Sequence, residues 1–154
     1  MQIFILRHGK AEMESESGLD RDRKLILEGK RELVQVGQDL KRRAEAIEKI
    51  FTSPYIRAKE SAEIIQKHIA CARGLEVMEE LASGAQMKQQ LLAIEKISKR
   101  ANSFLLVGHM PDLGILADYF LGDQHEISLK PGNLLKIEIN DLEKEGSGRL
   151  IYSI

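Results

Sequence analysis

A chemically reactive trio, Arg7-His8-Gly9, directly follows the apolar run from Ile3 to Leu6. Four consecutive apolar residues predict a short strand that is covered on both faces. A guanidinium and an imidazole are costly to leave unpaired inside a core, so they belong at its edge. We therefore predict that a first strand delivers His8, as a reactive imidazole, to the rim of a sheet.

Two further groups of the same chemical kind follow other predicted strands. Arg57 lies in the opening turn of a predicted helix, just after a strand at 50–52, and His109 comes after a strand at 103–107. In parallel sheets, ligands bind beyond the carboxyl ends of the strands. Two cations and two imidazoles at that edge would form a positive pocket. Such a pocket suits a phosphoryl group, whose transition state spreads charge over three equatorial oxygens.

The elements that must position these residues alternate along the chain. Strands are predicted at 3–6, 50–52, 75–78 and 103–107, and one or two closing strands within 134–139 and 150–154. The charged stretch 9–24 is predicted to be a surface loop, and Pro111 and Gly122 are placed to open and end the last helix. Apolar residues at helical spacing predict four helices, on Leu33, Val36, Leu40, Ala44 and Ile47; on Ala58, Ala62, Ile65 and Ile69; on Met87, Leu91, Ile94 and Ile97; and on Leu113, Leu116, Ala117 and Phe120. This order predicts an α/β fold, a three-layer α/β/α sandwich with a mostly parallel central sheet and helices on both faces.

Length and charge narrow the classes of protein that fit. At 154 residues, the whole chain, 1–154, is expected to form a single domain. Its 23 basic and 24 acidic side chains give a net charge of −1, so we expect no nucleic-acid partner. The single cysteine cannot form an internal disulfide, and no apolar stretch approaches the ~20 residues that span a bilayer. We therefore expect no membrane partner and a cytoplasmic location.

Three ordered motifs resemble those of the histidine phosphatase superfamily, with its RHG signature. They are Leu6-Arg7-His8-Gly9; Thr52-Ser53-Pro54-Tyr55-Ile56-Arg57-Ala58 followed by Ser61-Ala62-Glu63; and Leu106-Val107-Gly108-His109-Met110-Pro111. The compact length and the opening MQIFILRHGKAE are most similar to the SixA-type phosphohistidine phosphatases. The resemblance implies a phosphoglycerate mutase-like fold and a phosphatase that acts through a covalent phosphohistidine.

The same resemblance implies a role for each matching residue. His8 would attack phosphorus, Arg7 and Arg57 would clamp phosphate oxygens, and His109 would donate a hydrogen bond to another oxygen. Gly9 would let the backbone approach the phosphate without a side chain in the way. No metal or other cofactor is expected, because the cationic side chains can neutralise the phosphate charge.

The general acid is a weaker assignment. In larger members of the family, a glutamate four residues before a glycine donates the leaving-group proton, and Glu80 with Gly84 has that spacing. The alternative is that Glu80 is a surface carboxylate. Lys10 and the pair Glu60-Ser61 depart from the residues that are frequent at their positions, and they could tune specificity.

Other polar residues have simpler interpretations. His68, on the flank of the second helix, and His125, in a polar loop, are expected to be surface residues rather than ligands. Arg21, Arg23 and Lys24 could attract a phosphorylated substrate, but a solvated charged loop is the favoured interpretation.

The leading functional hypothesis is dephosphorylation of phosphohistidine in another protein, such as a phosphotransfer domain. Only about 23 residues separate Glu80 from the next strand, and a helix uses them, so an open pocket without a lid is expected. A small-molecule phosphomonoesterase is the alternative within enzymes. A non-catalytic module that docks phosphorylated partners is the alternative outside them.

Overall fold

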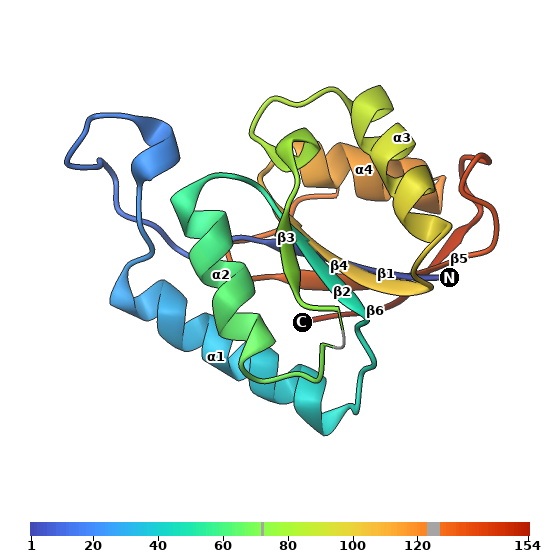
Figure 1. Cartoon of the computed structure of the whole chain (residues 1–154), viewed down its shortest axis with the longest axis horizontal. Coiled ribbons are helices and arrows are strands. Elements are labelled where there is room, and N and C mark those ends of the chain that lie inside the picture. Colours follow the sequence, from blue (N-terminus) through green and yellow to red (C-terminus); the bar gives the residue numbers. More distant parts are fainter. Residues whose placement is uncertain (72, 123–126) are drawn as a thin grey trace.

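A six-stranded sheet forms the centre of the computed structural model, which describes residues 1–71, 73–122 and 127–154 (Figure 1). The strand order is β3-β2-β4-β1-β5-β6. The strands are β1 (Gln2–Arg7), β2 (Lys49–Thr52), β3 (Leu75–Val77), β4 (Ser103–Gly108), β5 (Leu134–Ile139) and β6 (Gly148–Ser153). The first four run parallel, whereas β5 is antiparallel to both β1 and β6. The predicted mostly parallel sheet is therefore confirmed.

Helices cover both faces of this sheet, as the sequence predicts. Figure 1 shows α1 and α2 on one side and α3 and α4 on the other. Their bounds are α1 (Leu27–Arg42), α2 (Ile56–Gln66), α3 (Met87–Ser98) and α4 (Asp112–Leu121), with short 3-10 turns at η1 (Asp20–Asp22) and η2 (Glu79–Leu81). None of the helices in the described ranges is long and apolar enough to cross a bilayer.

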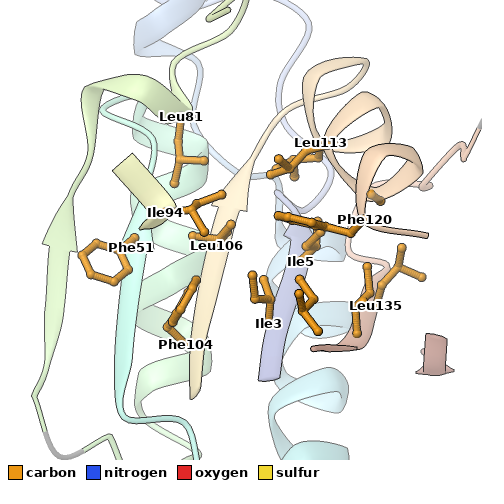
Figure 2. Close-up of a cluster of buried hydrophobic side chains, with 14 of the residues drawn as sticks. Ile3, Ile5, Phe51, Leu81, Ile94, Phe104, Leu106, Leu113, Phe120 and Leu135 are labelled. Atoms are coloured by element: carbon orange, nitrogen blue, oxygen red, sulfur yellow. The ribbon is translucent and has the colours of Figure 1, made fainter. Parts of the chain in front are cut away.

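Alternation along the central strands divides the core into two clusters. Ile3 and Ile5 of β1 pack with Phe104 and Leu106 of β4 against α4, as Figure 2 shows. The intervening residues of β1, Phe4 and Leu6, face α1 and α2 instead. All four apolar residues of β1 are fully buried. Both faces of β1 are thus covered by helices, which holds the strand and the residues at its carboxyl end in place.

The register of the parallel strands aligns the three polar strand exits. Arg7 pairs with Gly108, and Thr52 pairs with Val107, so the next residues, His8, Ser53 and His109, emerge at nearly the same level. The His8 amide donates a hydrogen bond to the Gly108 carbonyl at 3.1 Å, and the Ser53 amide donates one to Val107 at 2.9 Å. The sheet therefore brings together residues that are about 50 and 100 positions apart in the chain.

Two predicted helices are shorter than their apolar spacing suggests. The first helix ends at Arg42, because Ala44 has a left-handed φ of 52° that cannot continue a helix, and Ile47 is buried from the loop before β2 instead. The second helix ends at Gln66, so Ile69 lies beyond it. In both cases an apolar loop residue that contacts the core, buried Ile47 or partly buried Ile69, coincides with the helical period. Gly122 ends α4 with a φ of 68°, as predicted.

His68 also lies outside the helix to which the sequence assigned it. It follows the end of α2 and is half-buried, and a Cβ on Gly37 of α1 would lie only 2.8 Å from its Cδ2. His68 therefore packs against α1 rather than on the flank of α2. His125 lies outside the described residues.

Candidate active site

His8 leaves the end of β1 with its ring held in one orientation. Its side chain is buried, with only 8% of the residue exposed. The Nδ1 atom lies 2.8 Å from the carbonyl oxygen of Gly9, which can only accept, so Nδ1 carries the ring proton. The neutral ring then has its lone pair on Nε2, 3.2 Å from the Nε–H of Arg57. The nitrogen that carries the lone pair therefore faces a cation.

Arg57 is held by the loop that precedes α1. Its Nη1 donates to the Asp20 carbonyl at 2.6 Å and its Nη2 donates to the Asp20 carboxylate at 2.9 Å. The guanidinium carbon also lies 5.0 Å from the centre of the Tyr55 ring. Together with the contact to His8, these bonds give each of the three side-chain nitrogens of Arg57 a hydrogen-bond partner. The residue is 4% exposed, so this charge is oriented before any ligand arrives.

His109 follows β4 and lies beside His8, with ring centroids 5.0 Å apart. Its Nε2 is 2.7 Å from the Ser53 hydroxyl, which also accepts the Tyr55 amide at 3.3 Å. We assign the hydroxyl as the donor to Nε2, an assignment that satisfies the serine proton and places the ring proton of His109 on Nδ1. That Nδ1 is buried and has no partner within the described part of the chain. A buried unpaired N–H is suited to an anionic oxygen.

Arg7, the last residue of β1, has its guanidinium fixed from the opposite side. Its Nη1 donates to the Leu129 carbonyl at 2.7 Å, while its Nε is buried without a partner among the described residues. Burial and the charge of Arg57 lower the pKa of Arg7. The two guanidinium groups therefore lie close enough to repel each other, and a bound dianion would relieve that repulsion.

The same environment keeps both imidazoles neutral. Burial, followed by the charges of Arg57 and Arg7, lowers the pKa of His8 to about 4. The hydrogen bond from Nδ1 to Gly9 raises this pKa but does not offset the lowering. Burial and then the His8 and Arg57 charges lower the pKa of His109 to about 3. Both rings are therefore uncharged at neutral pH, each with a single ring proton. His8 thus keeps the lone pair that a nucleophile requires.

Ser61 links the peptide after His8 to the backbone of Arg57. The Ser61 hydroxyl accepts the Gly9 amide at 3.0 Å and donates to the Arg57 carbonyl at 2.6 Å. Because the Gly9 carbonyl holds Nδ1 of His8, this serine supports the peptide that sets the His8 tautomer. The preceding residue, Glu60, accepts the Leu25 amide at 2.7 Å and pairs with Lys30, so it fastens the loop before α1.

The structure brings together the four predicted residues Arg7, His8, Arg57 and His109, with Gly9 beneath His8. Glu80 is not among the contacts that join them, although the next residue, Leu81, places its carbonyl oxygen beside Gly108, directly before His109. Glu80 lies in η2 after β3, and its neighbours are Glu79 and the exposed side of α3, where they line a shallow hollow of about 340 Å³. Within the described ranges, Glu80 forms no hydrogen bond or ion pair. Its role as general acid stays a prediction.

Lys10 and Arg23 bind protein carboxylates and a carbonyl rather than converging on a common anion site. The Lys10 ammonium pairs with Glu28 at 2.5 Å and Glu32 at 2.8 Å, both on α1. Arg23 donates to Asp20 and to the Glu12 carbonyl, which ties the loop together. Among the residues the structure describes, no group of three or more histidine, cysteine, aspartate or glutamate side chains could hold a metal ion.

Sequence reasoning missed the residues that support the four central side chains. Asp20 lies in a charged loop without periodicity, so no sequence signal connects it with Arg57. Ser53 and Tyr55 belong to a motif between strand and helix, but their types do not reveal the contact with His109. The signal that could have indicated Ser53 is its position directly after a strand, at the same sheet edge as His109.

Comparisons with known proteins agree with this arrangement. The sequence model of the histidine phosphatase superfamily (branch 1) matches residues 3–89. An uncharacterized protein of Picosynechococcus is 31% identical over 140 residues, which cover 88% of this chain and 83% of that protein. The phosphohistidine phosphatase SixA homolog of Haemophilus influenzae is 26% identical over 145 residues, covering 89% and 87%.

A solved structure shows the same fold. The protein histidine phosphatase SixA complexed with tungstate superposes with a TM-score of 0.90 at 22% identity, covering 100% of this chain and 96% of that one. The family match spans more than half of the residues and includes His8 and Arg57. The chain therefore belongs to branch 1 of the histidine phosphatase superfamily, and phosphatase chemistry is the activity that this membership supports.

Proposed function

We propose that this protein hydrolyses a phosphoryl group through a covalent phosphohistidine on His8, and that its substrate is phosphohistidine in another protein. The observation that carries the proposal is the state of His8. Its Nδ1 is committed to the Gly9 carbonyl, its pKa is about 4, and its Nε2 lone pair faces Arg57. A neutral, oriented imidazole beside a cation is the group that in-line attack on phosphorus requires.

The proposed reaction has two displacements. The Nε2 lone pair of His8 attacks phosphorus, the bond from phosphorus to the substrate nitrogen breaks, and the departing imidazole takes up a proton from solvent. Water then attacks the phosphorus on His8 and the bond to Nε2 breaks. One proton of that water stays on the inorganic phosphate, and the other is released to solvent. Arg7, Arg57 and the Nδ1–H of His109 would hold the charged oxygens throughout, without a metal ion.

Two observations favour a protein as the substrate. Two proteins of similar sequence are the phosphohistidine phosphatase SixA homolog of Haemophilus influenzae and the phosphohistidine phosphatase SixA of Escherichia coli. Between η2 and β4 the chain forms α3 and packs it on the sheet, so this stretch supplies no lid over the site. An open site can admit a side chain that another protein presents.

The first experiment is to trap the intermediate. The protein is incubated with a ³²P-phosphorylated histidine phosphotransfer domain, with and without EDTA, and quenched in alkali. We expect label on the wild-type chain that survives base and is lost in acid, in both buffers, and no label on His8→Ala. His68→Gln serves as the matched control, because it changes a histidine outside the site and should keep the label.

A substrate panel then separates the alternatives. Phosphohistidine protein, phosphoserine peptide and sugar phosphate are compared by kcat/KM. The proposal predicts the highest value for the phosphohistidine protein. Rapid turnover of sugar phosphate with none of the phosphoprotein would establish a small-molecule phosphomonoesterase instead. Tight binding without label or turnover would establish a docking module.

A further inference from the structure

A cavity of about 650 Å³ lies between β2, β3 and the end of α3, and we call it the basic cavity. Phe51 of β2, Ile97 of α3 and Ala101, two residues before β4, supply its apolar walls. Figure 2 shows the Phe51 ring at the margin of the buried cluster, where β3 pairs with β2. The basic cavity is therefore lined by part of the core at the β3 edge of the sheet.

The basic cavity and the candidate active site lie toward opposite ends of the same strands. Lys49, which begins β2, and Ala101, before β4, line the cavity. The residues of the candidate active site that follow these strands, Ser53 and His109, leave their carboxyl ends. A molecule in the basic cavity would therefore not take the place of the phosphoryl group.

The lining of the basic cavity carries a large excess of positive charge. One of its side chains, Glu76, is acidic, whereas five are basic, namely Lys49, Arg73, Lys96, Lys99 and Arg100. The chain as a whole has a net charge of −1, so this gathering of cations is local. Charges of one sign that converge on a hollow repel each other, and they raise the local concentration of anions.

Two of the five cations have no anionic partner. Lys96 and the guanidinium of Arg100 form no ion pair or hydrogen bond with residues in the described ranges. Arg73 donates to the Arg100 carbonyl, which joins the segment before β3 to the segment after α3. The other three cations each pair with a carboxylate: Lys49 with Glu76, Arg73 with Glu48 and Lys99 with Glu95. The walls are thus held together while two charges at the end of α3 are left to bind an anion.

The size and chemistry of the basic cavity favour one kind of occupant. Small-molecule sites measure ~300–1,000 Å³, so the cavity has room for a molecule of metabolite size. An inorganic anion would satisfy Lys96 and Arg100 but leave the apolar walls in water. An uncharged apolar molecule would cover Phe51 and Ile97 but leave the two cations without a partner. A molecule with both an apolar part and negative charges satisfies both sets of residues.

We propose that the basic cavity is a second binding site, for a small organic anion that joins a planar apolar body to two or more negative charges. Nucleoside diphosphates belong to this chemical class. The planar body lies against Phe51 and Ile97, because aromatic rings pack favourably on one another and on aliphatic side chains. The negative charges bind Lys96 and the guanidinium of Arg100, whose planar fork matches phosphate oxygens. The inference is independent of the substrate proposed above.

The test uses α,β-methylene-ADP as the probe, because its bridging bond resists hydrolysis. It is titrated into the full chain, and binding is followed by the amide NMR signals of residues 49–51 and 96–101. We expect these signals to shift and to saturate. Adenosine has only the planar body and pyrophosphate only the charges, so each should bind about tenfold or more weakly than the probe at the same signals. Because the dissociation constant is read from these signals, binding at the candidate active site is recorded separately.

A double variant, Lys96→Ala with Arg100→Ala, checks the two cations. It should raise the dissociation constant for the probe about tenfold or more, because charge-assisted hydrogen bonds are lost. Turnover of p-nitrophenyl phosphate should stay within about twofold of wild type, which shows that the variant is folded. The matched control, Lys41→Ala with Arg42→Ala, removes the same two charges from the last turn of α1 and should bind the probe as the wild type does.

Three results would overturn the inference. Shifts confined to the candidate active site, at Gly9 and Gly108, would show that the basic cavity does not bind the probe. Pyrophosphate binding at the cavity signals as tightly as the probe would show that the apolar walls take no part. Equal weakening in the two double variants would show that the probe responds to overall charge rather than to this cavity.

Discussion

The two imidazoles of this site have their centroids 5.0 Å apart, and their hydrogen-bond partners lead us to assign them opposite tautomers. On His8 the proton is on Nδ1, because the Gly9 carbonyl accepts it, and Nε2 is left to attack. On His109 the Ser53 hydroxyl occupies Nε2, and the Nδ1–H is left to donate. In the proposed reaction, one ring serves as the nucleophile and the other as a hydrogen-bond donor because of their neighbours rather than their residue type.

Ser53→Ala tests this assignment. Removing the hydroxyl frees Nε2 of His109, so the ring can move its proton away from Nδ1 and stop donating to phosphate. We expect kcat/KM to fall about tenfold or more, as for other residues that orient a functional imidazole. The ¹⁵N NMR shifts of the His109 ring nitrogens should change, which a purely structural role would not produce.

Ser103→Ala is the matched control for the loss of a buried serine hydroxyl. Its hydroxyl donates to the Ala46 carbonyl at the opposite end of β4, so both activity and the His109 shifts should be preserved. An unchanged His109 spectrum in Ser53→Ala would refute the tautomer assignment.

The residue types of the site could be predicted, but their chemical states could not. Arg7, His8, Arg57 and His109 each follow a strand or open a helix after one, and parallel strands end at a common edge. That reasoning needs only periodicity and order. The tautomers depend on Gly9 and Ser53, and the orientation of Arg57 depends on Asp20, whose position results from packing of an irregular loop. No local sequence signal encodes such contacts.

At the scale of elements, the close approach of α1 to the exit of β1 decides where His8 is placed. Gly29 in the first turn of α1 lies against Lys10, and a Cβ there would be 2.4 Å from the Lys10 carbonyl oxygen. Gly9 itself faces α1, since its own Cβ would lie 2.7 Å from Leu33. The helix therefore packs directly on the peptide that follows the nucleophile.

Gly29→Ala is expected to disturb both stability and catalysis. The new methyl meets backbone atoms, which can move only if α1 or residues 9–10 shift, and overpacking of this kind costs about 1–3 kcal/mol. We expect a lower midpoint in urea unfolding and a clear loss of kcat. In the matched variant Gly37→Ala, on the same helix, the methyl meets the Cβ and ring of His68, so the clash displaces the segment after α2 and not the peptide that follows His8. That variant should retain wild-type kcat, and equal kinetic losses in the two would refute the positioning role of Gly29.

The order and type of the elements follow from sequence patterns, whereas two of their ends do not. Apolar spacing predicts four helices and the central strands because burial imposes a period on each. The same spacing extends falsely through Ala44 and Ile47, since a loop residue can be apolar because it enters the core from another direction. Backbone conformation, such as the left-handed Ala44, ends a helix without leaving a signal in hydropathy.

For the molecule as a whole, a nearly neutral chain places two arginines beside two buried histidines. The net charge is −1, yet Arg7 and Arg57 act on both histidines, and burial adds to their effect. This arrangement favours a bound phosphoryl group, and it disfavours protonation of the two histidines in the folded state. Stability should therefore depend on pH in a range where carboxylates contribute little.

That pH dependence can be measured by urea unfolding between pH 7 and pH 5. The pKa values of His8 and His109 are about 4 and about 3 in the folded chain, below the 6.5 of an unperturbed histidine. As the pH falls below 6.5, the unfolded chain binds protons that the folded chain refuses, so the free energy of unfolding decreases, by about 2 kcal/mol per histidine at pH 5. The carboxyl groups with shifted pKa values, including Asp20, have ordinary pKa values below 5, and the fold lowers them further. They therefore change the free energy of unfolding mainly at more acidic pH. A double variant, His8→Asn with His109→Asn, should lose most of the dependence, and an unchanged slope in that variant would show that the two rings are not the groups kept neutral by the fold.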